Sequence, residues 1–571
     1  MMYNRFAMGS IYTLILLISF SSSVLNAQQL VGQNGVEGLI RNVMEAGGPE
    51  ERLRAAGTEL YSSVVLHRFY QERHFKPAWI KDRKITEIGY EMRYEVYQAR
   101  FDGLNPEDYH LGLINSYFSK FEQLQKLGQS PEDGDLAAID ILLTDAYIML
   151  SSHLYLGKVE PEQLKAIWNI QRAAPELLID KRLEEALQVG SIRKSLESLY
   201  PSFVIYKKMR DGLRALYEDQ KRFDQSPVSN WKKLKVDKSI KPGESHNAIP
   251  EIRKRLEFWG YLTSAPLGDE KIYDSLMVPG IKKIQLRHGM ESDGVIGQGT
   301  VHALGQTPSD LIATAAVNLE RLRWLPDKLK DQEIILVNTA NFQLDYLFNR
   351  DTLFTSRVIV GKSYHATPQF DGLMSYIVFS PTWTVPTSIV RNEIIPALKK
   401  DPQYLGKKNM KLLTSDGKVI DPAGIDWSKV NPRSFPYTVR QEPGEQNSLG
   451  LVKFMFPNKH SVYIHDTPSR SLFAREDRAL SHGCVRIQKP FEFAKLLLSF
   501  DTQWTDERII AAMKQTTERT VMLDRKIPVV MLYLTYWCDA SGKTYFRRDV
   551  YSRDEEIYKA LIETKGKKSG V

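Results

Sequence analysis

The sequence predicts a multidomain α+β protein, because its hydrophobic pattern changes period along the chain. Apolar residues recur at three- and four-residue steps in the first part of the chain, as on helices, and alternate from about residue 331 onward, as on strands. With 571 residues, 42% hydrophobic and 26% charged, the chain can form roughly three or four domains with cores of their own. Only two cysteines are present, Cys484 and Cys538, which excludes a disulfide scaffold and leaves room for one reactive thiol.

Residues 1–27 have the pattern of a secretory signal peptide. Arg5 precedes the apolar run from Ile11 to Phe20, and small and polar residues follow as far as Ala27. The run is short for a membrane-spanning helix, although an uncleaved anchor stays open as an alternative. We therefore expect a periplasmic or other cell-envelope protein. Loss of Arg5 with the signal would lower the formal net charge by one unit from +8, and export makes nucleic acid an unsuitable partner.

Residues 28–230 are expected to form a helical scaffold domain. Its clearest helix carries one apolar stripe, formed by Leu136, Ile139, Leu143, Ala146 and Leu150. Asp140 and Asp145 on the same helix are interpreted as solvated or capping groups. The lysine-rich stretch from Trp231 to Gly243 is interpreted as a solvated linker.

Residues 245–308 predict a compact helical module. One helical face runs from Ile249 to Trp259 and ends at Gly260, a second helix covers 278–288, and a turn at Asp293-Gly294 precedes a third. The module resembles a small three-helix peptidoglycan-binding domain, although Ile284 stands where that family usually has Phe. The residues that carry the resemblance are Ile284-Gln285, Arg287-His288-Gly289, Asp293-Gly294, Ile296-Gly297, Thr300 and Leu304. Most of them set turns or fill the core, so the pattern indicates the fold more firmly than a sugar site.

Residues 309–330 are expected to form a connecting helix, and residues 331–537 a mainly β catalytic domain. The expected strands are 333–339, 357–360, 376–379, 461–465 and 529–536. A polar insertion at 391–440 is our candidate lid or capping segment. A C-terminal extension, 538–571, follows, and Cys538 at its start is interpreted as a packing residue because no histidine lies nearby in the sequence.

The residues with chemical potential are concentrated between Tyr463 and Arg486. Acyl transfer by a thiol needs a base and a group that orients the base. His465 ends an apolar strand and can be the base for Cys484, and Asp466 can orient it through its carbonyl or its side chain. The run Ser481-His482-Gly483-Cys484 offers consecutive backbone N–H groups for an oxyanion hole. Arg478 and Arg486 place positive charge where a carboxylate-bearing substrate or the thiolate would benefit.

His465 together with Ser481-His482-Gly483-Cys484-Val485-Arg486 resembles the active-site signature of L,D-transpeptidases of the YkuD fold. Further resemblance to the large YcbB-type branch of that family lies in 318–326, 357–362, 367–368, 383–386 and 447–450, and in the N-terminal helical part and the central module. The resemblance thus covers most of the chain after the signal segment.

The resemblance implies a reaction on peptidoglycan. Cys484 would attack the carbonyl of the third residue of a tetrapeptide stem, release D-Ala, and pass the acyl group to an amine, forming a 3→3 cross-link. His465 would act as base and then acid, Asp466 would orient it, and the amides of Gly483 and Cys484 would hold the oxyanion. Among the expected substrate-binding residues, Tyr463, Ser481 and Arg486 would contact the stem and His482 would shape the site. Carbapenems acylate this cysteine in the family, so a carbapenem adduct is expected.

Several alternatives stay open at this point. Transfer to water would make the protein an L,D-carboxypeptidase, and transfer to another amine would attach a protein or exchange a D-amino acid. A zinc site could use His460, His465, His482 and Cys484, but no metal-ligand spacing is present, so no metal and no cofactor are expected. A non-catalytic wall-binding scaffold is the third reading. The expected partners are donor and acceptor stem peptides, glycan through the central module, and cell-wall synthesis proteins.

Overall fold

The computed structural model describes residues 35–46, 52–164, 168–170, 177–226, 229–326, 333–349, 351–539 and 541–563. The expected signal peptide, 1–27, lies outside the described residues. The chain divides into two compact units, one made of Met1–Lys158, Ala174–Tyr200 and Leu561–Val571, the other of Val159–Ala173 and Pro201–Ala560. No helix among the described residues is both long and apolar enough to cross a membrane.

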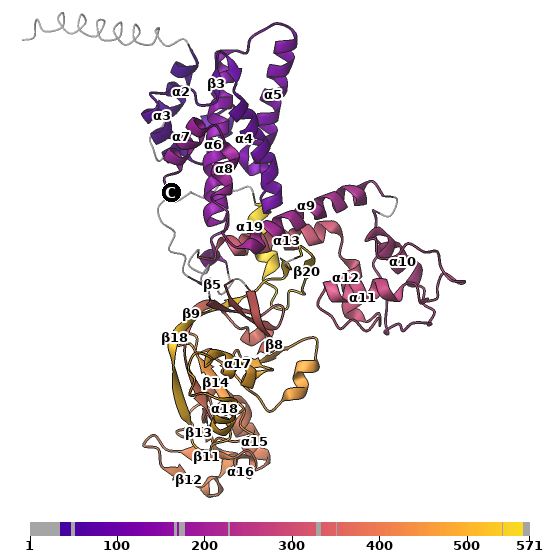
Figure 1. Cartoon of the computed structure of the whole chain (residues 1–571), viewed down its shortest axis with the longest axis vertical. Coiled ribbons are helices and arrows are strands. Elements are labelled where there is room, and N and C mark those ends of the chain that lie inside the picture. The colour runs from indigo at the N-terminus through magenta and orange to yellow at the C-terminus, as the bar shows by residue number, and fades with distance from the viewer. Residues whose placement is uncertain are drawn as a thin grey trace, which may run out of the picture. The chain divides into compact units, whose positions relative to one another are not determined.

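The first unit is helical, with two short hairpins (Figure 1). Its helices are α2 (Val36–Glu45), α3 (Ser63–Glu72), α4 (Glu87–Gln98), α5 (Leu111–Lys126), α6 (Asp133–Leu156), α7 (Ile179–Val189) and α8 (Ile192–Glu197). The hairpins pair β1 (Arg54–Ala55) with β2 (Thr58–Glu59) and β3 (Ile80–Lys81) with β4 (Lys84–Ile85). Helix α6 has other helices of the unit on several sides, which makes it the centre of this bundle.

The expectation that Asp140 and Asp145 on α6 are solvated is wrong, because both side chains are 0% exposed. Asp140 accepts hydrogen bonds from the N–H groups of Ala78 and Trp79, and burial raises its pKa to about 6. Asp145 accepts from Ser62 N at 3.0 Å and is paired with His110. Helix α6 is thus buried all round rather than along one stripe, and its carboxylates cap chain segments that cross it.

The second unit contains helix α9 (Val204–Asp224), the three-helix module and helix α13 (Pro308–Arg323). We expected the scaffold to extend to residue 230, whereas α9 packs against α13 in the second unit. The module consists of α10 (Ile249–Phe258), α11 (Val278–Arg287) and α12 (Gln298–Gly305) around a core that includes Ile252, Ile281 and Leu304. Gln285 accepts from Gly294 N and donates to Asp293, so this part of the motif holds the turn before α12.

The largest sheet of the second unit is curled and has ten strands. Its main members are β6 (Glu333–Asn338), β7 (Gln343–Phe348), β8 (Asp351–Gly361), β9 (Gln369–Phe379), β14 (Val452–Met455), β15 (Ile464–His465), β17 (Val485–Ile487) and β18 (Arg519–Leu532), with β5 (Trp168–Asn169) and β16 (Ala479–Ser481) at the margins. Strand β14 pairs with both β15 and β9, so the strand order closes on itself. Helices α17 (Pro490–Leu497) and α18 (Asp506–Met513) share its apolar core. The α+β fold class is confirmed.

The insertion between β9 and β14 is a folded subdomain rather than a loop. It contains α14 (Thr387–Ile389), a π-helical turn η6 (Val390–Ile394), α15 (Ile395–Lys400) and α16 (Tyr404–Lys407), with the sheet β10 (Trp383–Thr384), β13 (Thr438–Gln441), β11 (Met410–Leu413) and β12 (Val419–Ile420). Its own apolar core includes Ile395, Leu398, Leu412 and Val439. The capping segment that we placed at 391–440 therefore lies inside a slightly larger unit with an independent core.

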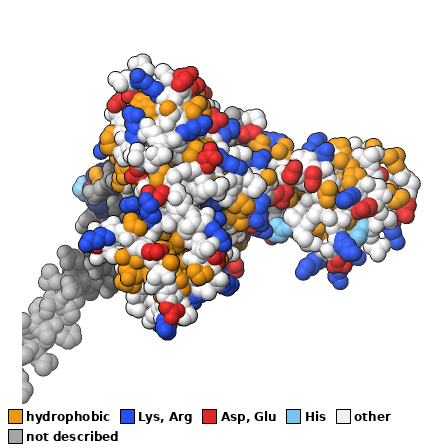
Figure 2. Space-filling model, turned by 90° about the horizontal axis from the view of Figure 1, so that it is seen from below, with side chains coloured by type: hydrophobic (Ala, Val, Ile, Leu, Met, Phe, Trp, Pro, Cys, Tyr) orange, Lys and Arg blue, Asp and Glu red, His pale blue; other side chains and the backbone are white. Residues whose placement is uncertain are grey.

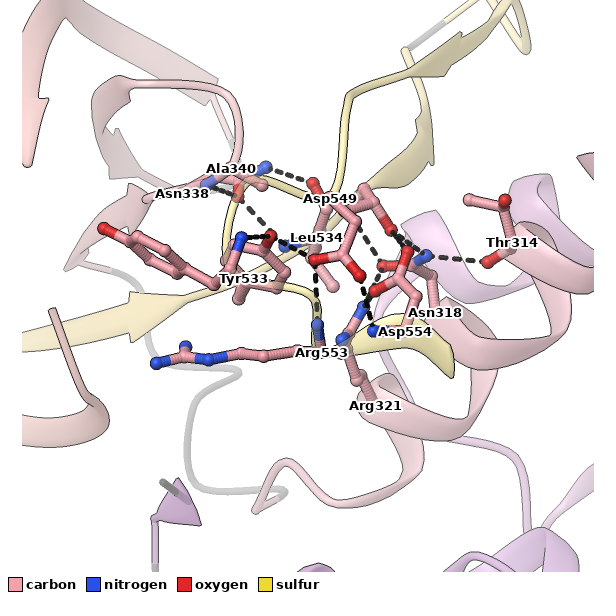
Figure 3. A network of polar contacts seen from close by, with 12 residues as sticks. Thr314, Asn318, Arg321, Asn338, Ala340, Tyr533, Leu534, Asp549, Arg553 and Asp554 are labelled. Carbon is pink, nitrogen blue, oxygen red and sulfur yellow. Dashed lines mark hydrogen bonds and ion pairs between the residues drawn. The ribbon is translucent and has the colours of Figure 1, made fainter. Parts of the chain in front are cut away.

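The C-terminal extension contains the hairpin of β19 (Tyr536–Cys538) and β20 (Thr544–Phe546), followed by α19 (Asp554–Ile562). Figure 3 shows the polar network that fixes this region: Asn318 of α13 bonds to Thr535, and Arg321 pairs with Asp554 at 2.7 Å. Asp549 accepts hydrogen bonds from the hydroxyl of Tyr533 and from the N–H groups of Arg553 and Asp554. The extension is thereby fastened to α13 and to the end of β18.

Basic and acidic side chains are mixed over the face drawn in Figure 2. The formal charge of +8 is a small difference between 77 basic and 69 acidic residues. On this face the excess is not gathered into a single patch. The overall charge therefore says little about where a polymer would bind, and the local arrangement of the site is more informative.

Candidate active site

Strand register places four of the predicted site residues on one face of the sheet. In the parallel pair of β15 and β17, Ile464 lies opposite Val485 and His465 lies opposite Arg486. Ile464 and Val485 are both wholly buried in the core. Because side chains alternate between the faces of a strand, Tyr463, His465, Cys484 and Arg486 share the opposite face. His465 and Cys484 are 19 positions apart, and the pairing of β15 with β17 brings the segments that carry them side by side.

His465 is held in one orientation and in one tautomer. Its side chain is buried, and Nδ1 lies 2.6 Å from the carbonyl oxygen of Asp466, which can only accept. Nδ1 therefore donates its proton to that carbonyl, and the backbone of Leu449 is a second hydrogen-bond partner of the ring. Burial, followed by the charges of Arg486 and, less strongly, Lys453, lowers the pKa of His465 to about 3. The imidazole is therefore neutral near pH 7 and can act as a base.

Asp466 orients His465 through its backbone, and its carboxylate has other partners. The carboxylate accepts from Leu451 N at 2.9 Å and from Arg470 at 2.5 Å, and burial is the main cause that raises its pKa. Gly450 makes this arrangement possible, because a Cβ there would lie 2.3 Å from Cγ of Asp466 and its φ is +63°. Of the two ways in which Asp466 could orient the base, the carbonyl contact is the one present.

Cys484 is a partly buried thiol with polar neighbours. Burial raises its pKa, and contacts with Tyr463 and the charge of Arg486 oppose that rise. The pKa of Tyr463 is raised in turn, first by burial and then by Cys484. Arg486 is also largely buried, and its Nε has no hydrogen-bond partner in the described part of the chain. The resting pair is therefore a neutral thiol beside a neutral imidazole, rather than the low-pKa thiolate that the sequence suggested.

The loop before Cys484 is held by a serine. Ser481 is buried, donates to the carbonyl oxygen of Cys484 at 2.6 Å and accepts from Gly483 N at 3.0 Å. Gly483 has a φ of +119°, which glycine tolerates and other residues rarely adopt. The N–H of Gly483, which we expected in the oxyanion hole, is thus already engaged. Ser481, expected to contact the substrate, has its hydroxyl committed to shaping the loop.

His482 faces the insertion subdomain. Its Nε2 lies 2.7 Å from a carboxylate oxygen of Glu393, which belongs to the π-helical turn η6. Both side chains are partly exposed, at 34% and 52%. Single π-helical turns are rare in proteins, and those that occur lie frequently at functional sites. The subdomain that we predicted as a lid therefore contacts the signature loop directly.

The four residues of the alternative zinc reading do not form a ligand set. Within the ranges that the structure describes, no three His, Cys, Asp or Glu side chains converge as metal ligands. His460 instead lies against Phe370, with ring centroids 4.9 Å apart. The groups that interact with the Cys484 thiol instead include Tyr463 and the guanidinium of Arg486.

The sequence analysis assigned no role to two residues that contact the signature loop. Thr367 donates its hydroxyl to the carbonyl of Gly483, and Glu393 contacts His482. They lie 116 and 89 residues from their partners in the chain. No spacing rule connects such distant positions, so only the folded chain identifies them.

Comparisons with known proteins agree with this geometry. Residues 332–519 match the family described as "L,D-transpeptidase catalytic domain", residues 65–213 the family "Scaffold domain", and residues 245–304 the family "Putative peptidoglycan binding domain". A relative from Haemophilus influenzae, named "Putative L,D-transpeptidase", is 37% identical over 256 residues, which are 44% of this chain. The chain spans about half, 50%, of the length of that relative.

Two solved structures are also similar in part. An L,D-transpeptidase from Stackebrandtia nassauensis is 15% identical, with 51% of this chain and 94% of that chain covered and a TM-score of 0.20. One from Xylanimonas cellulosilytica is 10% identical, with 52% and 99% covered and a TM-score of 0.17. Scores this low support no structural argument. The family matches and the curated relative show that the chain contains an L,D-transpeptidase catalytic domain, together with a scaffold domain and a peptidoglycan-binding domain.

Proposed function

We propose that this protein cross-links peptidoglycan as an L,D-transpeptidase with Cys484 as nucleophile and His465 as base. The observation that carries the proposal is the shared sheet face, on which a tautomer-fixed, neutral His465 lies on the strand next to Cys484. This arrangement meets the requirements of covalent acyl transfer, a nucleophile and a base held by a third group.

In the first half-reaction, Sγ of Cys484 would attack the carbonyl carbon of the third stem residue while its proton passes to Nε2 of His465. Since the pKa of the thiol is raised and that of the imidazole is lowered, this transfer accompanies the attack rather than preceding it. The carbon–nitrogen bond then breaks, and D-Ala leaves with the proton from His465. A thioester remains on Cys484.

In the second half-reaction, an amine of a neighbouring stem would attack the thioester and pass a proton to His465. The carbon–sulfur bond breaks, and the thiol regains a proton. The product is a 3→3 cross-link when the amine belongs to the third residue of that stem. Water, a free D-amino acid or a protein amine would instead give a carboxypeptidase, an exchange enzyme or an attachment enzyme from the same thioester.

Arg486 is our candidate for recognising the substrate. Its buried, unpartnered Nε lies in the group of residues around Cys484, and stem peptides carry carboxylates that a guanidinium binds well. Lys453, opposite His465 in the register of β14 and β15, adds a second positive charge on this face. Tyr463, next to the thiol, completes the expected contacts with the stem.

Incubating the full chain with a purified disaccharide tetrapeptide, and resolving the products by mass, tests the proposal. A dimer that has lost one D-Ala is the expected product, and monomer that has lost D-Ala identifies the carboxypeptidase alternative. A carbapenem should add its mass to the wild-type protein and not to Cys484→Ala. Turnover that survives Cys484→Ala would exclude the acyl-enzyme, and loss of turnover only upon chelation would support a zinc enzyme. Intact wall binding without turnover in the wild type would favour the scaffold reading.

For the insertion subdomain we propose a role as a lid over the bound stem. Its contact with the site is the hydrogen bond between Glu393 and His482. Glu393→Gln should raise KM for the stem by a few fold, since one exposed ionic contact contributes less than about 1 kcal/mol. Deleting 391–440 should impair stem turnover more than labelling of Cys484 by iodoacetamide. Equal losses of both would indicate general damage to the fold.

For the central module we propose contact with the glycan or its stems, through a cleft of about 630 Å³ within the second unit. Its lining combines Trp259, Tyr261 and Arg287 of the module with Lys208 of α9 and Lys543 of the C-terminal hairpin. Aromatic faces stack on sugar rings, and cations pair with stem carboxylates. Tyr261→Ala combined with Lys543→Ala should weaken sedimentation with purified sacculi and leave alkylation of Cys484 unchanged. Undiminished sedimentation would refute this assignment.

These proposals imply a location in the cell envelope, where peptidoglycan is found. The described residues contain no membrane-spanning helix, and the proposed signal at 1–27 would direct export. The mass of the mature N-terminus, measured on protein purified from cells, would distinguish a cleaved signal from a retained anchor.

A further inference from the structure

The carbonyl of Gly483 has a dedicated partner, the hydroxyl of Thr367. Thr367 is 0% exposed and lies just before β9, on the turn that follows β8. Its Oγ1 lies 3.0 Å from Gly361 N and 2.9 Å from Gly483 O. The N–H can only donate and the carbonyl can only accept, so the hydroxyl donates to Gly483 O. The hydroxyl of Tyr551 is a further contact of Thr367.

Fixing this carbonyl also fixes the N–H of Cys484. The two groups belong to one planar trans peptide and point in opposite directions. The N–H of Cys484 donates to no acceptor within the described residues, whereas the N–H of Gly483 is engaged by Ser481. The amide of Cys484 lies beside its own Sγ and is thus the backbone donor available to an oxygen on the carbon that Sγ attacks.

Nothing in glycine itself would keep this peptide in place. Gly483 has a φ of +119° and no side chain, so rotation of the plane meets little local resistance. A rotated plane would turn the carbonyl toward the site and the donor away from it. Ser481 holds the peptide before Gly483, and Thr367 holds the peptide after it.

The turn that carries Thr367 is itself fastened on two sides. Lys362 N donates to Ser481 O at 2.9 Å, and a Cβ on Gly361 would lie 2.0 Å from the carbonyl oxygen of His365, which shows how tightly the turn closes. On the other side, the Tyr551 hydroxyl donates to Gly361 O at 2.7 Å, and the Arg553 side chain reaches Thr367 O. Arg553 belongs to the network drawn in Figure 3, so the C-terminal extension supports the turn.

From these contacts we infer that Thr367 is a positioning residue, which holds the peptide between Gly483 and Cys484 so that the N–H of Cys484 faces the oxyanion of the tetrahedral intermediate. The inference rests on the proposed acyl-enzyme reaction. It assigns a function in catalysis to the C-terminal extension as well, since Tyr551 and Arg553 hold the turn on which Thr367 lies.

The test compares acylation with alkylation in Thr367→Val, which keeps the shape of the side chain and removes the hydroxyl. Acylation by a stem peptide passes through an oxyanion, whereas attack on iodoacetamide does not. We expect kcat for D-Ala release to fall about 10- to 100-fold, below the loss of a whole oxyanion donor, with KM and the alkylation rate within about twofold of wild type. Thr367→Ser, which keeps Oγ, should recover kcat to within about threefold.

Thr339→Val is the matched control. Thr339 is also buried, and its hydroxyl donates to Leu532 O at 2.9 Å, in a part of the domain that holds no predicted site residue. Thr339→Val should lose about as much stability as Thr367→Val, and its kcat should equal that of the wild type. Wild-type kcat in a folded Thr367→Val, or equal losses of acylation and alkylation that Ser does not rescue, would overturn the inference.

If Thr367→Val does not fold, Tyr551→Phe decides the question. It removes the hydroxyl that holds Gly361 and contacts Thr367, and we expect kcat to fall about threefold with unchanged alkylation, while an unchanged kcat would overturn the inference. A wild-type protein that forms no acyl-enzyme with stems or with a carbapenem would instead refute the proposed function. The two failures are therefore distinguishable.

Discussion

The two cysteines lie in regions that look alike locally and differ in what surrounds them. Cys484 precedes β17 beside the hydroxyl of Tyr463, and Cys538 ends β19 with its Sγ 3.6 Å from the hydroxyl of Tyr536. Burial raises the pKa of both thiols, that of Cys538 to about 11. A thiol beside a tyrosine is thus common to both regions, partly buried at Cys484 and buried at Cys538, and the direction of the pKa shift does not separate them.

The difference lies in the rest of the neighbourhood. Cys484 shares a sheet face with His465 and Arg486, and a glycine with positive φ precedes it. Cys538 bonds to the carbonyl oxygen of Lys208 and packs in the hairpin. Under the proposed function, the contrast predicts that reactivity at Cys484 comes from a base on the neighbouring strand, which removes the proton during attack, and not from a preformed thiolate.

Replacing each cysteine by alanine gives the strongest test of this contrast. Cys484→Ala should lower turnover of tetrapeptide stems by about 10⁴-fold or more, because the covalent route is lost. Cys538→Ala should leave kcat within about twofold and lower only the melting temperature, since it deletes a buried sulfur. Product release followed by mass spectrometry, with thermal melts of both variants, measures this. Similar kcat losses in the two variants would abolish the distinction.

Removing the base should have the next largest effect. His465→Ala should lower kcat by about 10²- to 10⁴-fold, the usual contribution of a general base. In the wild type, a pKa of about 3 keeps His465 unprotonated well below neutrality, so kcat should stay level between pH 7 and pH 5. A base with an ordinary pKa near 6.5 would lose activity in that interval. A pH–rate profile that falls tenfold there would contradict a buried, neutral His465.

The same histidine couples stability to pH. Its folded-state pKa is lower than its unfolded value near 6.5, so the unfolded chain binds the proton first as the pH falls. The stabilisation is therefore complete above about pH 6.5 and is lost as the pH falls toward about 3. His465→Gln should show a weaker loss of melting temperature over this range than the wild type. Parallel melting curves for the two proteins would rule out this contribution.

Replacing the tyrosine beside each cysteine by phenylalanine should have the smallest effect on the rates. It tests whether the hydroxyl matters at Cys484 and not at Cys538. The contact with Tyr463 lowers the pKa of Cys484, so Tyr463→Phe should raise that pKa and slow alkylation at pH 8 by about fivefold, the value of one hydrogen bond. Tyr536→Phe should change neither alkylation nor turnover, because Cys538 is 4% exposed in the folded protein. Rates measured with iodoacetamide under native conditions, and repeated in denaturant, check both statements. Faster labelling of Tyr463→Phe would reverse our account of the hydroxyl.

The fold could be predicted where it depends on the local hydrophobic pattern. Two predicted strands are shorter than expected because Asn side chains outside these strands bind the backbone there. The strand expected at 461–465 is shortened to Ile464–His465, because Ser461 has a positive φ and Asn458 binds the backbone of Val462. The strand expected at 529–536 ends at Leu532, since Asn338 takes the N–H of Leu534 and Asn318 that of Thr535. The alternation of apolar and polar residues within each segment does not indicate where its strand ends.

The candidate site shows the same division. The closeness of the Tyr463–His465 segment to Cys484 and Arg486 could be predicted because both lie within one stretch of chain. The tautomer of His465 could not, since it depends on which oxygen Nδ1 meets, and the sequence left both the carbonyl and the carboxylate of Asp466 open. The commitment of Ser481 to the loop is likewise a matter of tertiary geometry.

The sequence by itself determined the α+β class, the thiol and imidazole of the candidate site, and the match to an L,D-transpeptidase catalytic domain, because each depends on residue types at short spacing. Only the tertiary structure decided the charge state of Cys484 and His465, the burial of Asp140 and Asp145, and the contacts of Thr367 and Glu393 with the signature loop. The physical reason is that desolvation and hydrogen bonding depend on which distant segments pack against a group. Spacing along the chain carries no record of those segments.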